Sequence, residues 1–326
     1  MRIGQDILQA AHCLKLGQLV GVPTETVYGL AANACAESAV ISIFEAKKRP
    51  AFDPLIVHFA SFEAAKAYVD LSNWSEKRLA ELSSLAQNFM PGPLTVLLPK
   101  SDKIPPLVTS GLAHVGVRVP QHKLLQELLS NLPFPLAAPS ANPFGYISPT
   151  TAQHVAEQLG SEVAYILDGG ACEVGLESTV LGLDNDVWTV FRKGGLQIEN
   201  IEAVLGSVRV LAHSSSSPQA PGMLKSHYAP LKPLTLLHRS EVITQDEALS
   251  GTFFLLFENK IKHFEDQRQI LLSPNGSLNE AAQKLFAVMR ELDANPHCQR
   301  IIAEYFPEEG LGLAINDRLR RAAAKA

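Results

Sequence analysis

The apolar run at residues 54–59, PLIVHF, constrains the fold more than any other stretch, because it is apolar on both faces. A strand with that pattern is buried between two layers, as are the central strands of an α/β sheet. Another apolar run, Leu19–Val22, and a helical pattern over Glu37–Ala46 precede it. Ligands of open α/β sheets gather at the carboxyl ends of strands, where His58 stands. The sequence therefore predicts an α/β sheet with a binding site beside His58.

Two polar segments near these strands are candidate parts of that site. The turn Thr24–Gly29 reads TETVYG, and small hydroxyls beside a glycine suit a backbone that comes close to a ligand, although an ordinary strand-to-helix turn explains them equally well. Lys47, Lys48 and Arg49 stand in a row before Pro50, which disfavours continuation of the helix. Cations often end a helix because they complement its dipole. Because the three cations lie between the ends of two predicted strands, they also indicate an anion-binding site.

The length of 326 residues, of which 46% are hydrophobic, allows two domains that each bury a core. The sequence predicts domains at residues 1–205 and 233–326, joined by a linker at 206–232. The first domain carries 14 Lys and Arg against 20 Asp and Glu, within a net charge of −5 for the whole chain. An acidic domain that still concentrates three cations in one place indicates a focused pocket rather than a general nucleic-acid surface.

The sequence shows no pattern of membrane insertion or disulfide bonding. No apolar run approaches the roughly 20 residues that span a bilayer, and residues 1–17 read as an amphipathic helix rather than a signal peptide. The four cysteines are far apart and include no C-x-x-C pair, so neither a zinc site nor a disulfide framework is indicated. We therefore expect a cytoplasmic location, buried free thiols and no membrane partner.

The linker and the second domain differ in composition. The linker is rich in serine and proline without periodicity, but its end, PGMLKSHYAP at 221–230, is aromatic and basic enough to lie against a partner surface. Strand patterns then alternate with helical patterns, the strands at 234–237, 252–257 and 300–304 and the helices at 241–249, 278–292 and 314–324. This alternation predicts a small parallel α/β unit, in which we find no catalytic constellation.

Three further positions carry polar groups at the ends of predicted elements. Arg118 interrupts the apolar strand VGVRVP and needs a partner, either an internal carboxylate, the commoner outcome, or the carboxylate of a ligand. Ser148 before Pro149 reads as the N-cap of a helix that runs to Leu159, and a helix N-terminus is a ready phosphate site. Arg192 ends an apolar strand beside glycines. All three positions are compatible with an anionic ligand.

The common signatures of nucleotide and hydrolase sites are missing. The sequence contains no G-x-x-x-x-G-K-[ST] phosphate loop, no G-x-G-x-x-G dinucleotide turn, no G-x-S-x-G elbow and no H-E-x-x-H metal motif. A nucleotide, if one binds, is held in another way.

Seven motifs, in their order and spacing, resemble those of the YrdC-type L-threonylcarbamoyladenylate synthases. They are PTETVYGL, KKRP followed by PLIVH, MPGPLT, VGVRVP, PSANPFGYISPT, GLESTV and FRKGG. With HYAP in the linker and a second α/β domain, the resemblance is to the long, two-domain form and covers essentially the whole chain. It implies a YrdC-like twisted open sheet with flanking helices and a smaller, Rossmann-like C-terminal α/β domain.

The resemblance also implies an activity. Enzymes of this family are nucleotidyltransferases that condense L-threonine, bicarbonate and ATP into threonylcarbamoyl-AMP and pyrophosphate, for the threonylcarbamoyl-adenosine modification of tRNA. It implies Mg²⁺ as the companion of ATP, and the tRNA threonylcarbamoyl transferase machinery as a downstream partner. The sequence does not indicate the ligands of the metal.

Site residues follow from the same resemblance. L-threonine contacts are expected at Thr26, His58, Arg118, Ala138 and Ser178. ATP contacts are expected at Lys47, Arg49, Asp53, His114, Ser140, Ser148, Arg192 and Tyr228, and Lys47 and Arg49 are also assigned to catalysis. Three positions depart from the family pattern, in that Lys48 replaces a common glycine, Asp53 an asparagine and His114 a threonine. A carboxylate at position 53 is unfavourable beside a polyanion unless a metal intervenes.

We expect a carbamate of threonine to attack the α-phosphate of ATP, while cations neutralise charge and the linker end closes over the nucleotide. No residue stands out as a covalent nucleophile, and Ser140 and Ser178 are candidates by type only. Two alternatives remain open. One is a module that binds double-stranded RNA, and the other is hydrolysis of a carbamoyl phosphate-like compound.

Overall fold

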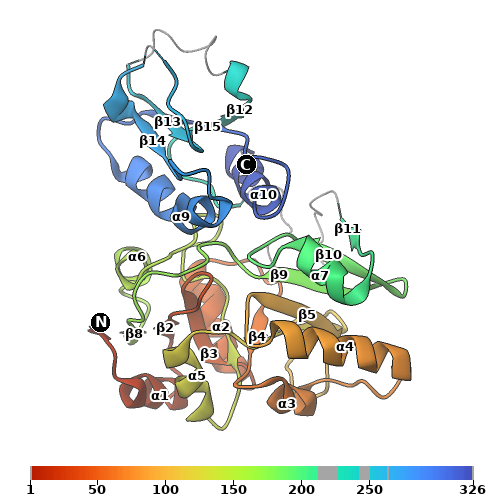
Figure 1. The fold of residues 1–326 in the computed structure, drawn as a ribbon. Coiled ribbons are helices and arrows are strands. Elements are labelled where there is room, and N and C mark those ends of the chain that lie inside the picture. The colour runs from red at the N-terminus through yellow and green to blue at the C-terminus, as the bar shows by residue number, and fades with distance from the viewer. Residues whose placement is uncertain (1, 212–226, 242–249, 263, 325–326) are drawn as a thin grey trace.

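The structure, a computed structural model, describes residues 2–211, 227–241, 250–262 and 264–324, which form two adjacent units (Figure 1). Within these residues the first unit is built on a mixed sheet of eleven strands, and the second on a sheet of four parallel strands. Helices flank both sheets. The predicted fold class, an open α/β sheet followed by a smaller Rossmann-like α/β domain, is confirmed.

The sheet of the first unit has the strand order β1-β8-β2-β3-β7-β4-β6-β5-β9-β10-β11. Its strands are β1 Arg2–Gly4, β2 Val20–Val22, β3 Gly29–Asn33, β4 Ile56–His58, β5 Leu94–Pro99, β6 His114–Arg118, β7 Leu136–Ala137, β8 Tyr165–Leu167, β9 Thr179–Asp184, β10 Val187–Arg192 and β11 Arg209–Val210. The helices of this unit are α1 Ile7–Lys15, α2 Glu37–Lys47, α3 Phe62–Ala65, the 3₁₀ turn Lys66–Tyr68, α4 Glu76–Phe89, α5 Lys123–Ser130, α6 Ala152–Leu159 and α7 Ile198–Leu205.

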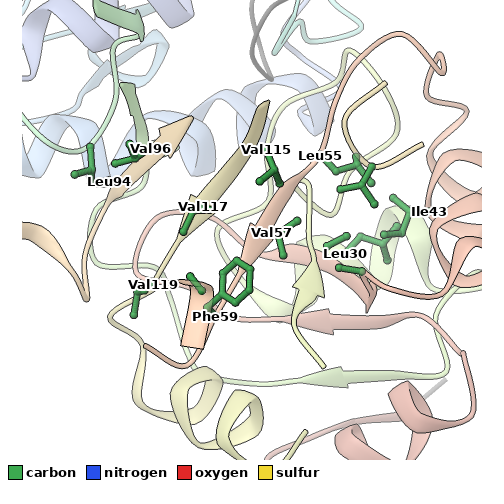
Figure 2. Close-up of a cluster of buried hydrophobic side chains, with 14 of the residues drawn as sticks. Leu30, Ile43, Leu55, Val57, Phe59, Leu94, Val96, Val115, Val117 and Val119 are labelled. Carbon is green, nitrogen blue, oxygen red and sulfur yellow. The ribbon is translucent and has the colours of Figure 1, made fainter. Parts of the chain in front are cut away.

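Strand alternation divides this sheet into a packed face and a face that carries the site. Val57, Val96 and Val117 point from β4, β5 and β6 into the main core (Figure 2). α2 and α4 complete this core with side chains such as Ile43 and Leu85. On the opposite face, α1 and α5 cover the half of the sheet that contains β8, β2 and β3. The other half of that face, formed by β4, β6, β5 and β9, carries the polar side chains of the site, and we call it the site face.

One row of cross-strand partners brings the key side chains of the site face together. His58 is paired with Arg118, Arg118 with Thr95, Thr95 with Val180, and Val180 with Arg192. The row crosses β4, β6, β5, β9 and β10, whose spacing of about 4.8 Å places its two ends roughly 19 Å apart at the backbone. Because residues in one row project from one face, the long arginine side chains can meet above the sheet.

The second unit has the strand order β12-β15-β13-β14, and all its strand pairs are parallel. Its elements are β12 Leu234–Leu237, β13 Thr252–Leu256, the 3₁₀ turn Asp266–Arg268, β14 Gln269–Leu271, α9 Leu278–Ala294, β15 Arg300–Glu304 and α10 Gly312–Ala323. Three apolar residues of the first unit, Val27, Ile147 and Leu176, belong to its core. The two units therefore share buried surface beside the site face.

Three strands of the first unit are absent from the sequence prediction. Residues 2–4 form β1, paired in parallel with β8, and the predicted N-terminal helix begins only after Asp6, whose side chain accepts the N–H of Gln9. Gly29–Asn33 forms β3, whose small residues give no strand pattern but fit between β2 and β7. β11 extends the sheet past residue 205, the predicted end of the domain.

The predicted N-cap at Ser148 is wrong. α6 begins at Ala152, and Thr151 is its N-cap, with its hydroxyl accepting the N–H of His154 at 3.2 Å. The Ser148 hydroxyl instead donates to Glu177 at 2.5 Å. The helix N-terminus that the sequence offered as a phosphate site is therefore not at Ser148.

Other predictions fall partly outside the described residues. Residues 242–249 of the predicted helix at 241–249 and residues 212–226 of the linker are among those not described. Among the described helices, none is long and apolar enough to cross a bilayer. Cys13, Cys172 and Cys298 are buried as expected, whereas Cys35 is exposed.

Lys48, at the end of α2, has a backbone conformation whose cost in stability can be tested. It has the left-handed conformation, with φ 51° and ψ 39°, and is exposed. That conformation costs an L-residue roughly 1 kcal/mol, which glycine avoids. We expect Lys48→Gly to raise the free energy of unfolding by about 0.5 kcal/mol, because the larger unfolded-state entropy of glycine offsets part of the gain. Urea unfolding followed by circular dichroism measures the change.

The matched control for this substitution is Lys77→Gly. Lys77 is exposed on α4, in ordinary helical backbone, and glycine there should lower stability by about 1 kcal/mol. A similar loss of stability in both variants would contradict the account of Lys48.

Candidate active site

Arg49, His58, Arg118 and Arg192 border one cavity on the site face. Its volume is about 50 Å³. The strand exits therefore converge as the sequence predicts. The other residues that line the cavity are Val27, Pro54, Ile56, Ala138, Pro139, Ser140, Glu177, Ser178, His227 and Tyr228.

Arg118 is held by the polar turn that follows β2. Its Nη2 donates to Glu25 Oε1 and to Thr26 Oγ1, both at 2.8 Å, and all three side chains are buried. The other oxygen of Glu25 accepts the N–H of Gln121 at 3.1 Å. An internal carboxylate therefore pairs with Arg118, the commoner of the two expected outcomes. Arg118 Nε is buried and has no hydrogen-bond partner in the described structure, so one donor remains for a ligand.

His58 stands beside Arg118 in the cross-strand row. It is buried, and its Nδ1 has no hydrogen-bond partner among the described residues. Burial, followed by the positive charge of Arg118, lowers the pKa of His58 to about 3. The imidazole is therefore neutral near pH 7, with one nitrogen that can donate and one that can accept.

The loop after α2 turns Arg49 toward the cavity. Its Nε donates to the carbonyl of Asp53 at 3.0 Å, its Nη2 donates to the carbonyl of Pro54 at 2.9 Å, and the Asp53 carboxylate lies 2.8 Å from Nη2. Burial lowers the pKa of Arg49, although the charge of Asp53 opposes this shift. Asp53 is fully buried and does not border the cavity. In the described structure Asp53 pairs with Arg49.

Lys47 lies behind the loop at residues 140–142. Its Nζ donates to the carbonyl of Ser140 at 2.5 Å and also to that of Asn142. Burial, followed by the charge of Arg49, lowers the pKa of Lys47 well below its usual value. The ammonium group thus holds the Ser140 loop, and it does not border the cavity.

Arg192 closes the opposite end of the cavity. It donates to the carbonyl of Ser178 from Nε at 3.1 Å and from Nη2 at 2.9 Å, and Nη2 also donates to the Ser178 hydroxyl at 3.1 Å. Ser178 Oγ lies 2.8 Å from the hydroxyl of Thr95. Burial is the main cause that lowers the pKa of Arg192. The beginning of β9 and the end of β10 are thereby tied together at the cavity wall.

The end of the linker covers the cavity. Tyr228 and His227 are buried, and their rings lie 4.1 Å apart at the centroids. Tyr228 stacks on Phe286 of α9, with 5.6 Å between the centroids, and the His227 ring meets the edge of Phe144 at 5.9 Å. Tyr228 has φ 63°, a conformation that L-residues rarely adopt. Contacts with both units therefore fix this segment over the cavity, as the sequence predicts for its aromatic end.

Besides Asp53, three predicted site residues contact the lining without bordering the cavity. Thr26 contacts Arg118, Lys47 contacts Ser140, and Ser148 contacts Glu177. The family resemblance identified the neighbourhood of these residues but not which of their side chains border the cavity.

His114 lies apart from the cavity. It is the first residue of β6 and Arg118 is the last, so about 13 Å of strand separates them. Alternation nevertheless places both on the same face of the strand, with Gly116 between them. His114 borders a separate hollow lined by Leu97, Leu112, Ala113, Leu183, Asp184, Asn185 and Phe191.

The site residues that the sequence prediction lacks include Glu25, Glu177, His227 and Arg318. Glu25 and Glu177 lie inside quoted motifs, and each pairs with a buried arginine. A carboxylate at a strand exit is a usable sequence signal, because a buried arginine needs such a partner. Arg318 gives no such signal, since its contact with Glu177 depends on how the two units dock.

The described carboxylates near the cavity do not form a metal site. Asp53, Glu25 and Glu177 each lie against an arginine. In the described part of the chain, no group of three or more His, Cys, Asp or Glu is placed to hold a metal ion. The residues present therefore do not fit a resident Mg²⁺.

An open α/β sheet that carries a cationic cavity, covered by a linker and a second α/β domain, defines a binding site for small anions. Residues 12–194 match the family model Sua5_yciO_yrdC, described as "Telomere recombination", and residues 196–324 match "Threonylcarbamoyl-AMP synthase, C-terminal domain". The chain therefore belongs to the Sua5/YciO/YrdC family, in its two-domain form.

Relatives match over nearly their full length. The chain is 40% identical to the threonylcarbamoyl-AMP synthase of Pyrococcus abyssi, over 96% of this chain and 92% of the relative. It is also 40% identical to that of Bacillus subtilis, over 98% of this chain and 93% of the relative. The crystal structure of P. abyssi Sua5 complexed with L-threonine has a TM-score of 0.88 and 38% identity, covering 99% of this chain and 97% of that chain.

The neutral state of His58 predicts a pH dependence of stability. The unfolded imidazole binds its proton near pH 6.5, whereas the folded one binds it only near 3, so this stability is lost as the pH falls below 6.5. Relative to His58→Gln, we expect the wild type to lose about 1.4 kcal/mol per pH unit between roughly pH 6 and 4. Urea unfolding at several pH values measures the difference.

The exposed His297 provides the control. His297→Gln should give a stability curve parallel to that of the wild type. If His58→Gln also runs parallel to the wild type, then His58 is not held neutral by burial.

Proposed function

We propose that this chain is a threonylcarbamoyl-AMP synthase, which condenses L-threonine, bicarbonate and ATP into threonylcarbamoyl-AMP with release of pyrophosphate. The observation that carries the proposal is the single cavity bordered by Arg49, His58, Arg118 and Arg192. Among the residues that line it, three guanidinium groups face one carboxylate, that of Glu177. Such a cavity favours an occupant with several negative charges.

L-threonine is proposed to occupy the end of the cavity at Arg118 and His58. Arg118 Nε is an unused donor that suits the α-carboxylate, and the neutral His58 suits the threonine hydroxyl. Ala138 and Ser178 border the same cavity, which supports their expected contacts with the amino acid. The relative solved as a complex with L-threonine adds support from the family.

ATP is proposed to lie between Arg49 and Arg192, with its phosphates near Ser140 and under Tyr228, which all border the cavity. Its base then extends along β6 over Gly116 toward His114. The hollow beside His114 has apolar walls from Leu97 and Phe191, and such walls suit a flat ring. This arrangement gives His114 a role although it lies apart from the cavity.

The chemistry needs positioning and charge neutralisation more than a reactive side chain. The threonine amine condenses with bicarbonate to a carbamate and water, and the carbamate oxygen then bonds to the α-phosphorus. The bond from that phosphorus to the bridging oxygen of the β-phosphate breaks, and pyrophosphate leaves. Arg49 and Arg192 would neutralise the charge on the phosphates. Lys47 would act by holding the Ser140 loop, rather than by contact.

Mg²⁺ would arrive with ATP, bound by the phosphate oxygens, since the surrounding carboxylates are paired with arginines. The product would pass to the tRNA threonylcarbamoyl transferase machinery. We expect this chain and that machinery to act in the cytoplasm. Double-stranded RNA fits the cavity less well, because Arg49, Arg118 and Arg192 are at most 9% exposed and the phosphate contacts of nucleic acids need accessible cations.

The proposed activity is tested by incubating the protein with ATP, L-threonine and labelled bicarbonate. We expect a labelled adenylate that depends on threonine, with one pyrophosphate released for each product molecule. Phosphate release without ATP would instead indicate hydrolysis of a carbamoyl phosphate-like compound. RNA affinity that falls steeply with salt and ignores threonine would indicate an RNA-binding module.

Two substitutions test the assignment of the two ends of the cavity. Arg118→Ala should raise the KM for L-threonine, and Arg49→Ala the KM for ATP, each by about 30-fold or more, because a buried charged hydrogen bond is lost. Lys66→Ala, which removes an exposed cation paired with Glu63, should leave both constants unchanged. Full activity of Arg49→Ala or Arg118→Ala would show that the site is assigned wrongly.

A further inference from the structure

Arg318 on α10 reaches from the C-terminal domain to the wall of the cavity. It is fully buried, and its Nε donates to Glu177 Oε2 at 2.8 Å. Its Nη2 donates to the carbonyl of Lys193 at 2.9 Å. Its guanidinium carbon lies 5.0 Å from the centre of the Tyr228 ring. One side chain of the second unit thus contacts a cavity carboxylate, the end of β10 and the residue that covers the site.

A second arginine of the C-terminal domain supports the other side of Glu177. Arg290 on α9 donates to the carbonyl of Ser148 at 3.2 Å and to that of Ile147. The Ser148 hydroxyl donates to Glu177 Oε1 at 2.5 Å. Both oxygens of the Glu177 carboxylate are therefore held, one directly by the second unit and one through a loop that the second unit fixes.

The pairing matters because Glu177 borders the cavity next to Arg192 and Ser178. A carboxylate released at this position would be drawn to the Arg192 guanidinium and would repel phosphates. With Arg318 in place, the charge of Glu177 is balanced from behind the cavity wall. Arg192 then stays directed at Ser178 and at the cavity.

We propose that Arg318 is a positioning residue for ATP, which keeps Glu177 away from Arg192 and fixes Tyr228 over the cavity. The first domain therefore binds ATP well only when the C-terminal domain is docked against it. This inference rests on the proposed function, and it assigns to the C-terminal domain a part in the site that its own sequence does not suggest.

The test compares Arg318→Met with the wild type in the adenylate assay. We expect the KM for ATP to rise at least tenfold, because Glu177 is freed and Tyr228 loses its contact. The affinity for L-threonine, measured by calorimetry without ATP, should stay within threefold, since Arg118 and His58 do not contact Arg318. A twofold or smaller change in the KM for ATP would overturn the inference.

The double variant Glu177→Gln/Arg318→Met separates positioning from a loss of folding. If the released carboxylate causes the defect, removing its charge should restore most of the lost ATP affinity. The double variant also lacks the unpaired buried charge that would destabilise Arg318→Met, so it keeps the test decisive if the single variant folds poorly. A double variant no better than Arg318→Met would contradict the proposal.

Arg320→Met is the matched control on the same helix. Arg320 is exposed and contacts Glu308 at 3.4 Å, so its loss should leave the KM for ATP unchanged. If the wild type itself makes no adenylate, the proposed function fails. If the wild type is active and Arg318→Met binds ATP equally well, only the role of Arg318 fails.

Discussion

The site depends on the strand register that aligns His58, Arg118, Thr95, Val180 and Arg192 in one row across five strands. A shift of any of these strands by one residue would send its side chain into the valine core on the opposite face. That core, with Val57, Val96 and Val117, therefore excludes a one-residue shift, because such a shift would take the valines out of it. The same packing that stabilises the sheet determines where the cations meet.

Burying several cations together carries a large desolvation cost, which ion pairs with buried carboxylates partly offset. Asp53 lies against Arg49, Glu25 against Arg118, and Arg318 against Glu177. Two of these three pairs leave a guanidinium facing the cavity, whereas in the third Arg318 balances, from behind the wall, a carboxylate that borders the cavity. Burial is the main cause that lowers the pKa values of Arg49 and Arg192. An anionic ligand bound in the cavity would add compensating charge beside these buried guanidinium groups.

Local patterns were sufficient for most of the fold and for part of the site. Apolar runs identified β4 and β6, and the motif order assigned Arg49, His58, Arg118 and Arg192, which border one cavity, to one site. Short strands such as β3, made of small residues, had no signal because their pairing depends on neighbours distant in sequence. The N-cap was misplaced because Ser148 and Thr151 both belong to the favoured cap residues, whereas in the structure the Ser148 hydroxyl is engaged by Glu177 and Thr151 caps the helix. The role of Arg318 could not be predicted from the sequence for the same reason, since the docking of the two domains determines its partner.

The central claim is that one cationic cavity holds threonine and the α-phosphate of ATP side by side. A crystal structure with L-threonine and a non-hydrolysable ATP analogue measures this directly. The account predicts the threonine carboxylate about 3 Å from Arg118 Nε, and phosphate oxygens at similar distances from Arg49 and Arg192. Phosphates bound outside the cavity, with Arg49 and Arg192 still engaged only by the protein, would contradict it.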